Sequence, residues 1–230
     1  KSDVPKRMLN KLISEQNDVH NQNLFIKKFS LPILLAFLFA LFNQLSGINA
    51  FLYYAPRIFE SAGLESSSAL LGTIGIGIAN LIFTLLGLYL IDKAGRKLLM
   101  YIGSIGYIVS LTLVSLAFIN SWEGLSVPLF LFIFIASHAI GQGAVIWVFI
   151  SEIFPNKLRA KGQSLGSSVH WILAAIITLV MPTALSYFNN PGYVFIFFAF
   201  MMVLQLFFVA FLMPETKGIS LEDLSEKLSS

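Results

Sequence analysis

Long stretches without a charged residue alternate with short charged segments along this chain. A bilayer core takes about 20 apolar residues of helix, so each stretch of that length predicts one membrane span. Four stretches fit one span each, and a fifth, 162–214, is divided by the turn-forming residues of 186–192. The pattern therefore predicts six membrane helices, at roughly 30–55, 69–91, 98–119, 126–151, 164–185 and 193–213.

The composition agrees with a membrane protein and excludes several other classes. Apolar residues make up 57% of the chain and charged residues 12%, whereas soluble domains are about 25% charged. The spans lack the alternation of a membrane barrel, and repeated spans are not a cleaved signal peptide. Because the chain has no Cys, disulfides, thiolate zinc sites and cysteine nucleophiles are excluded. A net charge of +3 without a basic patch predicts no nucleic-acid partner, and we expect neither a cofactor nor a metal.

The distribution of positive charge predicts the side of the membrane that each loop occupies. An even number of spans places both termini on one side, and 14 of the 15 Lys and Arg residues then share that side. Arg57 alone faces the other way. Because cytoplasmic loops carry the excess of Lys and Arg, we expect both termini to be cytoplasmic, in a plasma or inner membrane.

Two segments outside the spans are each predicted to form a short amphipathic helix on the cytoplasmic face, with a solvated segment as the alternative. In the first, apolar residues recur at helical spacing behind Pro5, namely Met8, Leu9, Leu12 and Ile13. In the second, Ser220 and Asp223 have the spacing of a capping box ahead of Leu224 and Leu228. The predicted division is a cytoplasmic segment over 1–28, a bundle over 29–213 and a cytoplasmic tail over 214–230.

A weak internal repeat relates the two halves of the bundle. Residues 30–47 align with 126–143 at an offset of 96, which matches Gly47 with Gly143. Each segment opens a group of three spans, and because three is odd the two groups are inverted. Inverted triplets whose first helix is interrupted by Gly are typical of transporters, with the substrate site at the interruptions.

Polar residues gather near the middle of the first span. Asn43, Gln44, Ser46 and Asn49 surround Gly47, and an unpaired polar group in hydrocarbon costs several kcal/mol. Two interpretations stay open: hydrogen bonds that join helices, or a pocket for an uncharged polyhydroxylated ligand. The span has no carboxylate or Lys for an ionic ligand.

Two cytoplasmic loops combine an acidic residue with Arg. One contains Asp92, Arg96 and Lys97, and the other contains Glu152 and Arg159. Similar loops on one face predict ion pairs that latch helix ends together, with simple membrane anchoring as the alternative.

Four motifs occur in one order along the chain: 43–49 followed by Tyr53 and Tyr54, then 92–97, 152–159 and 214–218. In this order and spacing they resemble the C-terminal six helices of the sugar porter family, within the major facilitator superfamily. The resemblance covers nearly the whole chain. It implies an all-α membrane protein whose six transmembrane helices form two inverted three-helix repeats, half of a major facilitator fold, with 1–28 as the end of a central intracellular domain.

The resemblance also implies a function and a set of partners. A monosaccharide, hexose or pentose, would cross the membrane by alternating access, in uniport or in symport with protons. The chain would not be an enzyme. Its partners would be the monosaccharide, the lipid bilayer, an N-terminal six-helix half and, in a symporter, protons.

Roles for individual residues follow from the same resemblance. The residues implied to bind substrate are Gln44, Asn49, Asn80, Trp147, Asn43, His170 and Trp171. An extracellular gate is implied at Tyr53 and Tyr54. A cytoplasmic latch that closes the outward-facing state is implied for Asp92, Arg96, Lys97, Glu152, Arg159 and Glu215. Proline residues usual in the family around the fourth-span interruption are replaced here by Gln142 and Ala144.

Other interpretations were weighed against the transporter. The sequence 162–166 spells G-x-S-x-G, so Ser164 with His138 or His170 would suit an intramembrane serine hydrolase. That motif requires a strand–turn–helix context, whereas Ser164 opens a helix, and no carboxylate lies within a span to orient a histidine. A channel would require paired half-helix motifs, and the chain has no Asn-Pro-Ala. A non-transporting fragment of a porter would share the fold and stays open.

Overall fold

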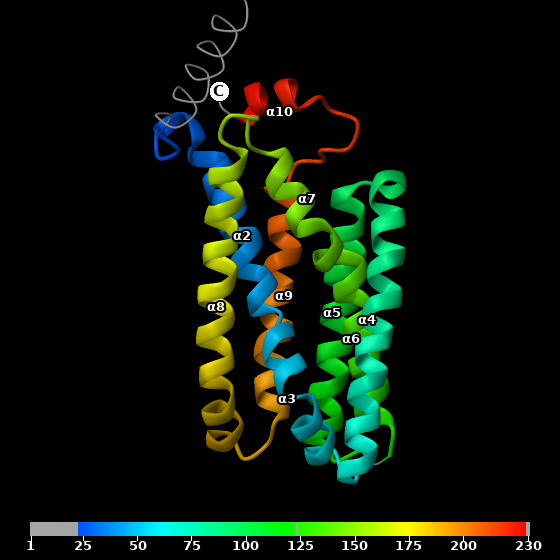
Figure 1. Ribbon diagram of the computed structural model, residues 1–230. Coiled ribbons are helices and arrows are strands. Elements are labelled where there is room, and N and C mark those ends of the chain that lie inside the picture. The colour runs from blue at the N-terminus through cyan, green and yellow to red at the C-terminus, as the bar shows by residue number, and fades with distance from the viewer. Residues whose placement is uncertain (1–22, 123, 229–230) are drawn as a thin grey trace, which may run out of the picture.

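The computed structural model describes residues 23–122 and 124–228. The regular structure of these residues is helical, and the long helices run side by side in an elongated bundle (Figure 1). The described part of the chain begins and ends at one end of the bundle, which we call the terminal face. The other end, where 62–65 and 188–191 connect helices, is the opposite face. The helix predicted behind Pro5 lies outside the described residues.

Six hydrophobic helices among the described residues are long enough to cross a membrane, which confirms the predicted number. Four of them are continuous, namely α4 (Ser66–Ala94), α5 (Arg96–Ile119), α8 (Arg159–Tyr187) and α9 (Gly192–Phe211). Their ends differ from the predicted ones, and α8 begins at Arg159 rather than at 164. The helix extends beyond the charge-free stretch because the long side chains of Arg159 and Lys161 can reach the polar surface from within the first turn of α8.

The first span consists of a short 3-10 turn and two helices, namely η1 (Lys27–Phe29), α2 (Ser30–Leu45) and α3 (Ile48–Ser61). The break lies at Gly47, whose φ of +81° is left-handed and typical of a residue just past a helix end. A Cβ at this position would lie 2.7 Å from the ring of Phe198, so the site excludes larger residues. The Ser46 hydroxyl donates to the Asn43 carbonyl at 2.6 Å and accepts from the Ile48 N–H at 3.3 Å. These bonds satisfy part of the backbone that the break leaves unpaired.

The fourth span is interrupted as well. It consists of α6 (Ser126–His138), the π-helical segment η2 (Ala139–Gly143) and α7 (Ala144–Glu152). Under the offset of 96, Gly47 in the first break corresponds to Gly143 at the end of the π-helix. Both predicted triplets therefore open with an interrupted helix, as expected from the repeat.

The interior contains two groups of buried aromatic and aliphatic side chains. Toward the opposite face Phe51, Tyr107 and Phe134 pack together, with ring centroids 5.5 Å and 5.3 Å apart. Toward the terminal face Phe39 packs against Phe149 at 5.1 Å. Burial is unequal among the spans. Within an 18-residue hydrophobic segment of each span, which we call its hydrophobic window, 17% is buried in α4 and 11% in α8, against 44% to 61% in the others.

A further helix lies on the terminal face (Figure 1). This helix, α10 (Leu221–Leu228), is capped by the Ser220 hydroxyl, which accepts from the Asp223 N–H at 3.1 Å. Leu224 and Leu228 are buried in the same cluster as Phe154. The structure thus confirms the predicted cap and the packing of the tail helix on the bundle.

Candidate functional site

Three amide side chains and one imidazole form a connected polar cluster at the α2–α3 break. The Asn49 Nδ2 donates to Gln44 Oε1 at 2.9 Å, and Gln44 Nε2 donates to Asn43 Oδ1 at 3.0 Å. The same Gln44 nitrogen lies 3.0 Å from Nδ1 and 3.2 Å from Nε2 of His170 on α8. The cluster therefore joins both halves of the broken first span to the fifth span.

The members of this cluster differ in burial. Gln44 is 0% exposed and Asn43 is 2% exposed, whereas Asn49 and His170 are partly exposed. In this conformation the outermost polar groups are therefore His170 and Asn49. Gln44 is covered in this conformation and is hydrogen-bonded to Asn49, His170 and Asn43, so its direct contact with substrate, like that of Asn43, stays a prediction.

Two indole rings flank the imidazole. The centroid of Trp147, on α7, lies 5.2 Å from that of His170, and Trp171 lies 5.0 Å away on the other side. Trp147 is 36% exposed and Trp171 is 60% exposed, so both offer ring surface outside the bundle core. Indole faces beside hydrogen-bonding groups suit a ligand that has both C–H and hydroxyl surface.

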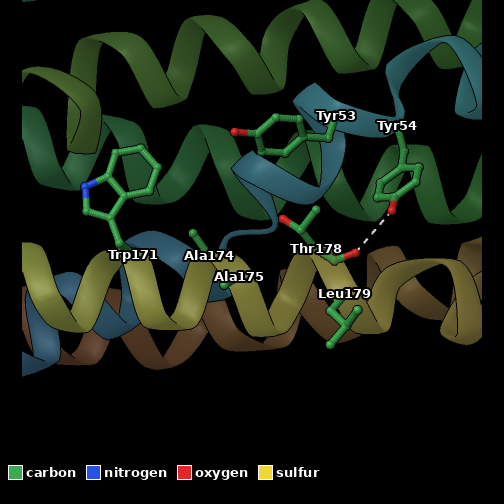
Figure 2. A pocket seen from close by; sticks show the side chains of 7 residues that line it. All are labelled: Tyr53, Tyr54, Trp171, Ala174, Ala175, Thr178 and Leu179. Carbon is green, nitrogen blue, oxygen red and sulfur yellow. Dashed lines mark hydrogen bonds between the residues drawn. The ribbon is translucent and has the colours of Figure 1, made fainter.

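An open groove of about 440 Å³ lies between α3 and α8 (Figure 2); it is lined by Trp171, the chain neighbour of His170, but not by the amides or the imidazole of the cluster. Trp171 lies at one end of it, and Tyr53 and Tyr54 project from α3 above α8. Asn49 precedes Tyr53 by one helical turn, so both lie on one side of α3. The Tyr54 hydroxyl donates to the Thr178 carbonyl at 3.2 Å, which ties α3, the helix of the predicted gate, to α8.

Asn80 does not join the polar cluster in this conformation. It lies on α4, which packs against α3, α5, α6, η2 and α7 and has no extensive contact with α2 or α8. Its side chain is partly exposed. A role in substrate binding for Asn80 stays a prediction.

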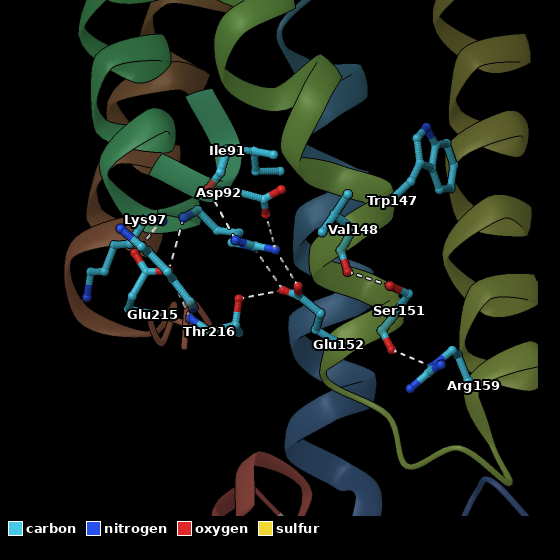
Figure 3. Close-up of polar contacts among 12 residues, drawn as sticks. Ile91, Asp92, Lys97, Trp147, Val148, Ser151, Glu152, Arg159, Glu215 and Thr216 are labelled. Atoms are coloured by element: carbon cyan, nitrogen blue, oxygen red, sulfur yellow. Dashed lines mark hydrogen bonds and ion pairs between the residues drawn. The ribbon is translucent and has the colours of Figure 1, made fainter. Parts of the chain in front are cut away.

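The predicted latch residues meet at the terminal face, except for one (Figure 3). Arg96 forms a bidentate pair with Glu152, with Nη2–Oε1 at 2.7 Å and Nε–Oε2 at 3.2 Å. Its Nη2 also lies 3.3 Å from the exposed Asp92. The Thr216 hydroxyl donates to Glu152 at 2.6 Å, which connects the pair to the tail. One network thus joins α4, α5, α7 and the segment before α10.

Glu215 caps α5 from a distant part of the chain. Its carboxylate accepts from the N–H groups of Arg96 and Lys97, both at 3.0 Å, where the helix dipole favours negative charge. Burial alone would raise the pKa of Glu215, but accepted backbone hydrogen bonds from Lys217, Arg96, Lys97 and Thr216 bring the pKa below its ordinary value. The Lys97 side chain donates to the Ala210 carbonyl of α9 at 3.2 Å.

Arg159 lies apart from this network, contrary to the prediction. Its Nε donates to the Ser151 carbonyl at 2.9 Å, and its buried Nη2 has no hydrogen-bond partner among the described residues. Glu152 ends α7 and Arg159 begins α8, as the loop spacing predicted, but the two side chains lie apart (Figure 3). Among the described residues Arg159 therefore has no acidic partner in this conformation.

A second buried polar network was not predicted. Gln142, in the π-helix, donates to Gln205 on α9, and Gln205 donates to Ser104 on α5 at 2.7 Å. All three side chains are 0% exposed, and Gln142 Oε1 has no partner among the described residues. Gln205 is an isolated amide in an apolar span, the same signal that drew attention to Asn80, and could have been found by it.

Comparison with known proteins adds a family to this geometry. The family model described as "Sugar (and other) transporter" matches residues 2–228. The chain belongs to this sugar transporter family. It is 34% identical over 198 residues to the D-xylose-proton symporter of Escherichia coli K12, covering 84% of this chain and 40% of the relative. It is 35% identical over 224 residues to the arabinose-proton symporter of Bacillus subtilis, covering 97% and 48%.

Solved structures of sugar transporters match the fold. The inward open structure of the xylose transporter XylE from E. coli superimposes with a TM-score of 0.78 at 30% identity, over 96% of this chain and 46% of XylE. XylE bound to 6-bromo-6-deoxy-D-glucose gives the same TM-score of 0.78 at 34% identity, over 86% and 42%. The chain is thus a multi-pass membrane protein with half of a major facilitator fold, and it spans less than half the length of these relatives. The family consists of transporters and not of enzymes, which sets the serine-hydrolase interpretation aside.

Proposed function

We propose that this chain is one half of a monosaccharide transporter that works by alternating access. The observation that carries the proposal is the polar cluster of Gln44, Asn49 and His170, whose imidazole lies between the indoles of Trp147 and Trp171. Trp171 also lines the open groove. Hydroxyl-bearing ligands are held by groups that both donate and accept, and amides and imidazole provide both without a fixed charge. The groove volume of about 440 Å³ lies within the ordinary range of small-molecule sites.

The partner of this half would be a second six-helix half of the same transporter. Supporting this, the hydrophobic windows of α4 and α8 are only 17% and 11% buried, although the other spans pack closely. Substrate sites of such transporters lie near the midplane between two repeats that rock against each other. The groove on α8 would then be closed by the second half rather than by lipid.

The terminal face would be the cytoplasmic side, as the distribution of Lys and Arg predicts. The network of Arg96, Glu152 and Glu215 would then lie at the cytoplasmic end of the spans. The buried, unpaired Nη2 of Arg159 fits a residue whose acidic partner belongs to the other half in the outward-facing state. Residues 1–28 would belong to the cytoplasmic connection between the halves, and 214–230 to a cytoplasmic tail.

Sugar binding by the complete protein that carries this chain tests the proposal. The panel is D-xylose, arabinose and D-glucose, the sugars that the names of relatives print. Asn49→Ala should weaken binding about two- to tenfold, because one hydrogen bond contributes about 0.5–1.5 kcal/mol. Asn120→Ala is the matched control, since Asn120 donates only to a carbonyl of its own helix at the opposite face. If Asn49→Ala lowers the melting temperature and leaves affinity unchanged, the cluster joins helices and does not bind sugar.

The mode of transport and a non-transporting role are separated by a second measurement. Sugar uptake that collapses when the proton gradient is removed identifies symport, and uptake that persists identifies uniport. Binding without uptake in liposomes, with the second half present, would identify a sugar-binding protein that does not transport.

A further inference from the structure

We propose that His170 must be neutral for tight sugar binding, so that acid weakens the affinity of this site through Gln44. The inference rests on the proposed function and concerns the same polar cluster. It assigns Gln44 a positioning role and makes His170 the residue through which pH acts.

The first step is the direction of the hydrogen bonds through the amides. Asn49 donates to Gln44 Oε1, so the nitrogen end of the Gln44 amide faces Asn43 Oδ1 and the imidazole. An amide NH2 only donates, so the ring must offer a lone pair. Because the Gln44 nitrogen is within reach of both ring nitrogens, either neutral tautomer satisfies it.

The second step is the effect of a proton. An imidazolium ring has no lone pair and donates from both nitrogens, so it opposes the Gln44 NH2. The Gln44 amide would have to turn over, and then Asn43 and Asn49 would have to turn as well to keep their bonds. Asn43 is 2% exposed and Gln44 is 0% exposed, so this reversal takes place in packed surroundings.

The third step is the charge around the ring. The helices packed against α8 are α2, α3 and α7. Among the described residues no carboxylate pairs with His170, and α2 carries no charged residue. The other titratable or charged groups on α8 and on these elements, with the nearby ring of His138 on α6, are Tyr53, Tyr54, Arg57, Glu60, Glu152, Arg159, Lys161 and Tyr187. Glu152 is already paired with Arg96, and Arg159 and Lys161 lie at the terminal face.

The consequence concerns the closed site. When sugar is bound at the cluster and the second half covers it, an imidazolium would be removed from water without a counter-charge, which is costly. Sugar binding and protonation of His170 therefore oppose each other, and by linkage each weakens the other by the same factor. This direction is the reverse of proton symport, in which proton and sugar bind together.

The test measures sugar affinity of the complete protein between about pH 5 and about pH 8, the range in which histidine titrates. Wild type should bind at least about fivefold more weakly at the acid end, a factor at the lower end of ordinary coupling between sites. His170→Gln, which keeps a donor and an acceptor, should bind with little dependence on pH. His138→Gln is the matched control, and its sugar affinity should fall at acid pH as that of wild type does. Tighter binding in acid, or the same profile for wild type and His170→Gln, would overturn the inference.

A second measurement examines the hydrogen bonds without sugar. In ring-nitrogen NMR of the histidine-labelled complete protein, the signals of His170 are those that His170→Gln removes. At neutral pH His170 should show one protonated and one hydrogen-bonded, lone-pair nitrogen, and Gln44→Leu should shift the second. An unchanged His170 signal in Gln44→Leu would overturn the inference even if sugar binds. Failure of wild type to bind any sugar of the panel at any pH would overturn the proposed function itself.

Discussion

At the scale of single residues, two glycines occupy positions that other residues cannot. Gly47 allows the left-handed turn between α2 and α3, and the Phe198 ring fills the space of a side chain. Gly95 has φ of +90° and ψ of 162°, a region almost restricted to glycine, and a Cβ there would lie 2.7 Å from Glu215 Oε2. The motif at 92–97 and the motif at 214–218 are therefore two parts of one contact.

Substitution of Gly95 tests this contact. Gly95→Ala should destabilise the protein by about 1–3 kcal/mol, because the backbone is strained and the Glu215 carboxylate is displaced from the α5 N-terminus. Thermal unfolding in detergent measures the effect. Gly77→Ala is the control: Gly77 is helical and a Cβ there meets no atom within 4 Å, so stability should hold or rise. Equal effects of both substitutions would contradict the argument.

The charge of Glu215 has its own pH dependence. Its pKa lies below its ordinary value of 4.5, so its contribution to stability is present above that value and is lost as pH falls through the lower, folded-state pKa. Glu215→Gln should therefore be less stable than wild type at neutral pH, and the difference should shrink as the pH falls below the ordinary pKa of 4.5. Paired unfolding curves of the two proteins measure it. A difference in stability between the two proteins that does not change with pH would show that the charge of Glu215 does not contribute to stability.

Some residue roles could be read from sequence and some could not. The polar character of the first span identified Gln44 and Asn49 as a cluster, because unpaired amides in hydrocarbon are costly. The burial of Gln44 under His170 could not be predicted, since the two residues are 126 positions apart and meet only through packing of α2 on α8. Thr216 was missed for the same reason, because its bond to Glu152 depends on the path of the tail.

At the scale of elements, polar side chains form hydrogen bonds at the interruption of both interrupted spans. The hydrophobic pattern predicted the number of spans, because it depends only on the length of apolar runs. It could not predict the π-helix at Ala139–Gly143, since one extra residue in a turn leaves the apolar pattern unchanged. In the structure Gln142 ties this π-helix to α9, and through Gln205 to α5.

A double-mutant cycle measures this anchor. Gln205→Leu should cost about 1–3 kcal/mol of stability, because it leaves the buried Gln142 amide without its acceptor. The double variant Gln142→Leu with Gln205→Leu should recover much of the loss, since replacing both partners by apolar groups removes the unsatisfied amide. The unfolding free energies of the two single variants and the double variant give the coupling free energy between Gln142 and Gln205. Additive losses would show that Gln142 and Gln205 act independently.

At the scale of the whole molecule, two of the six spans, α4 and α8, are left largely uncovered by the other described helices. The windows of α4 and α8 are 17% and 11% buried, and the groove beside Tyr53 and Trp171 opens on the same side as the exposed part of α8. This asymmetry is invisible in sequence, because lipid and a protein partner both favour apolar side chains. It agrees with the chain covering 40% to 48% of the length of the relatives described above.

The orientation of the bundle is the last prediction and can be measured directly, because the chain has no native Cys. Asn156→Cys places a thiol in the exposed α7–α8 connection of the terminal face, and Asn189→Cys places one in the exposed α8–α9 connection of the opposite face. Lys and Arg gather at the terminal face, so an impermeant thiol reagent added outside intact cells should label the protein at 189 and not at 156. Both substitutions remove the same side chain and leave the net charge unchanged, so each is the control for the other. After the cells are opened both thiols should react, and labelling at 156 in intact cells would reverse the topology and place the Arg96–Glu152 network outside.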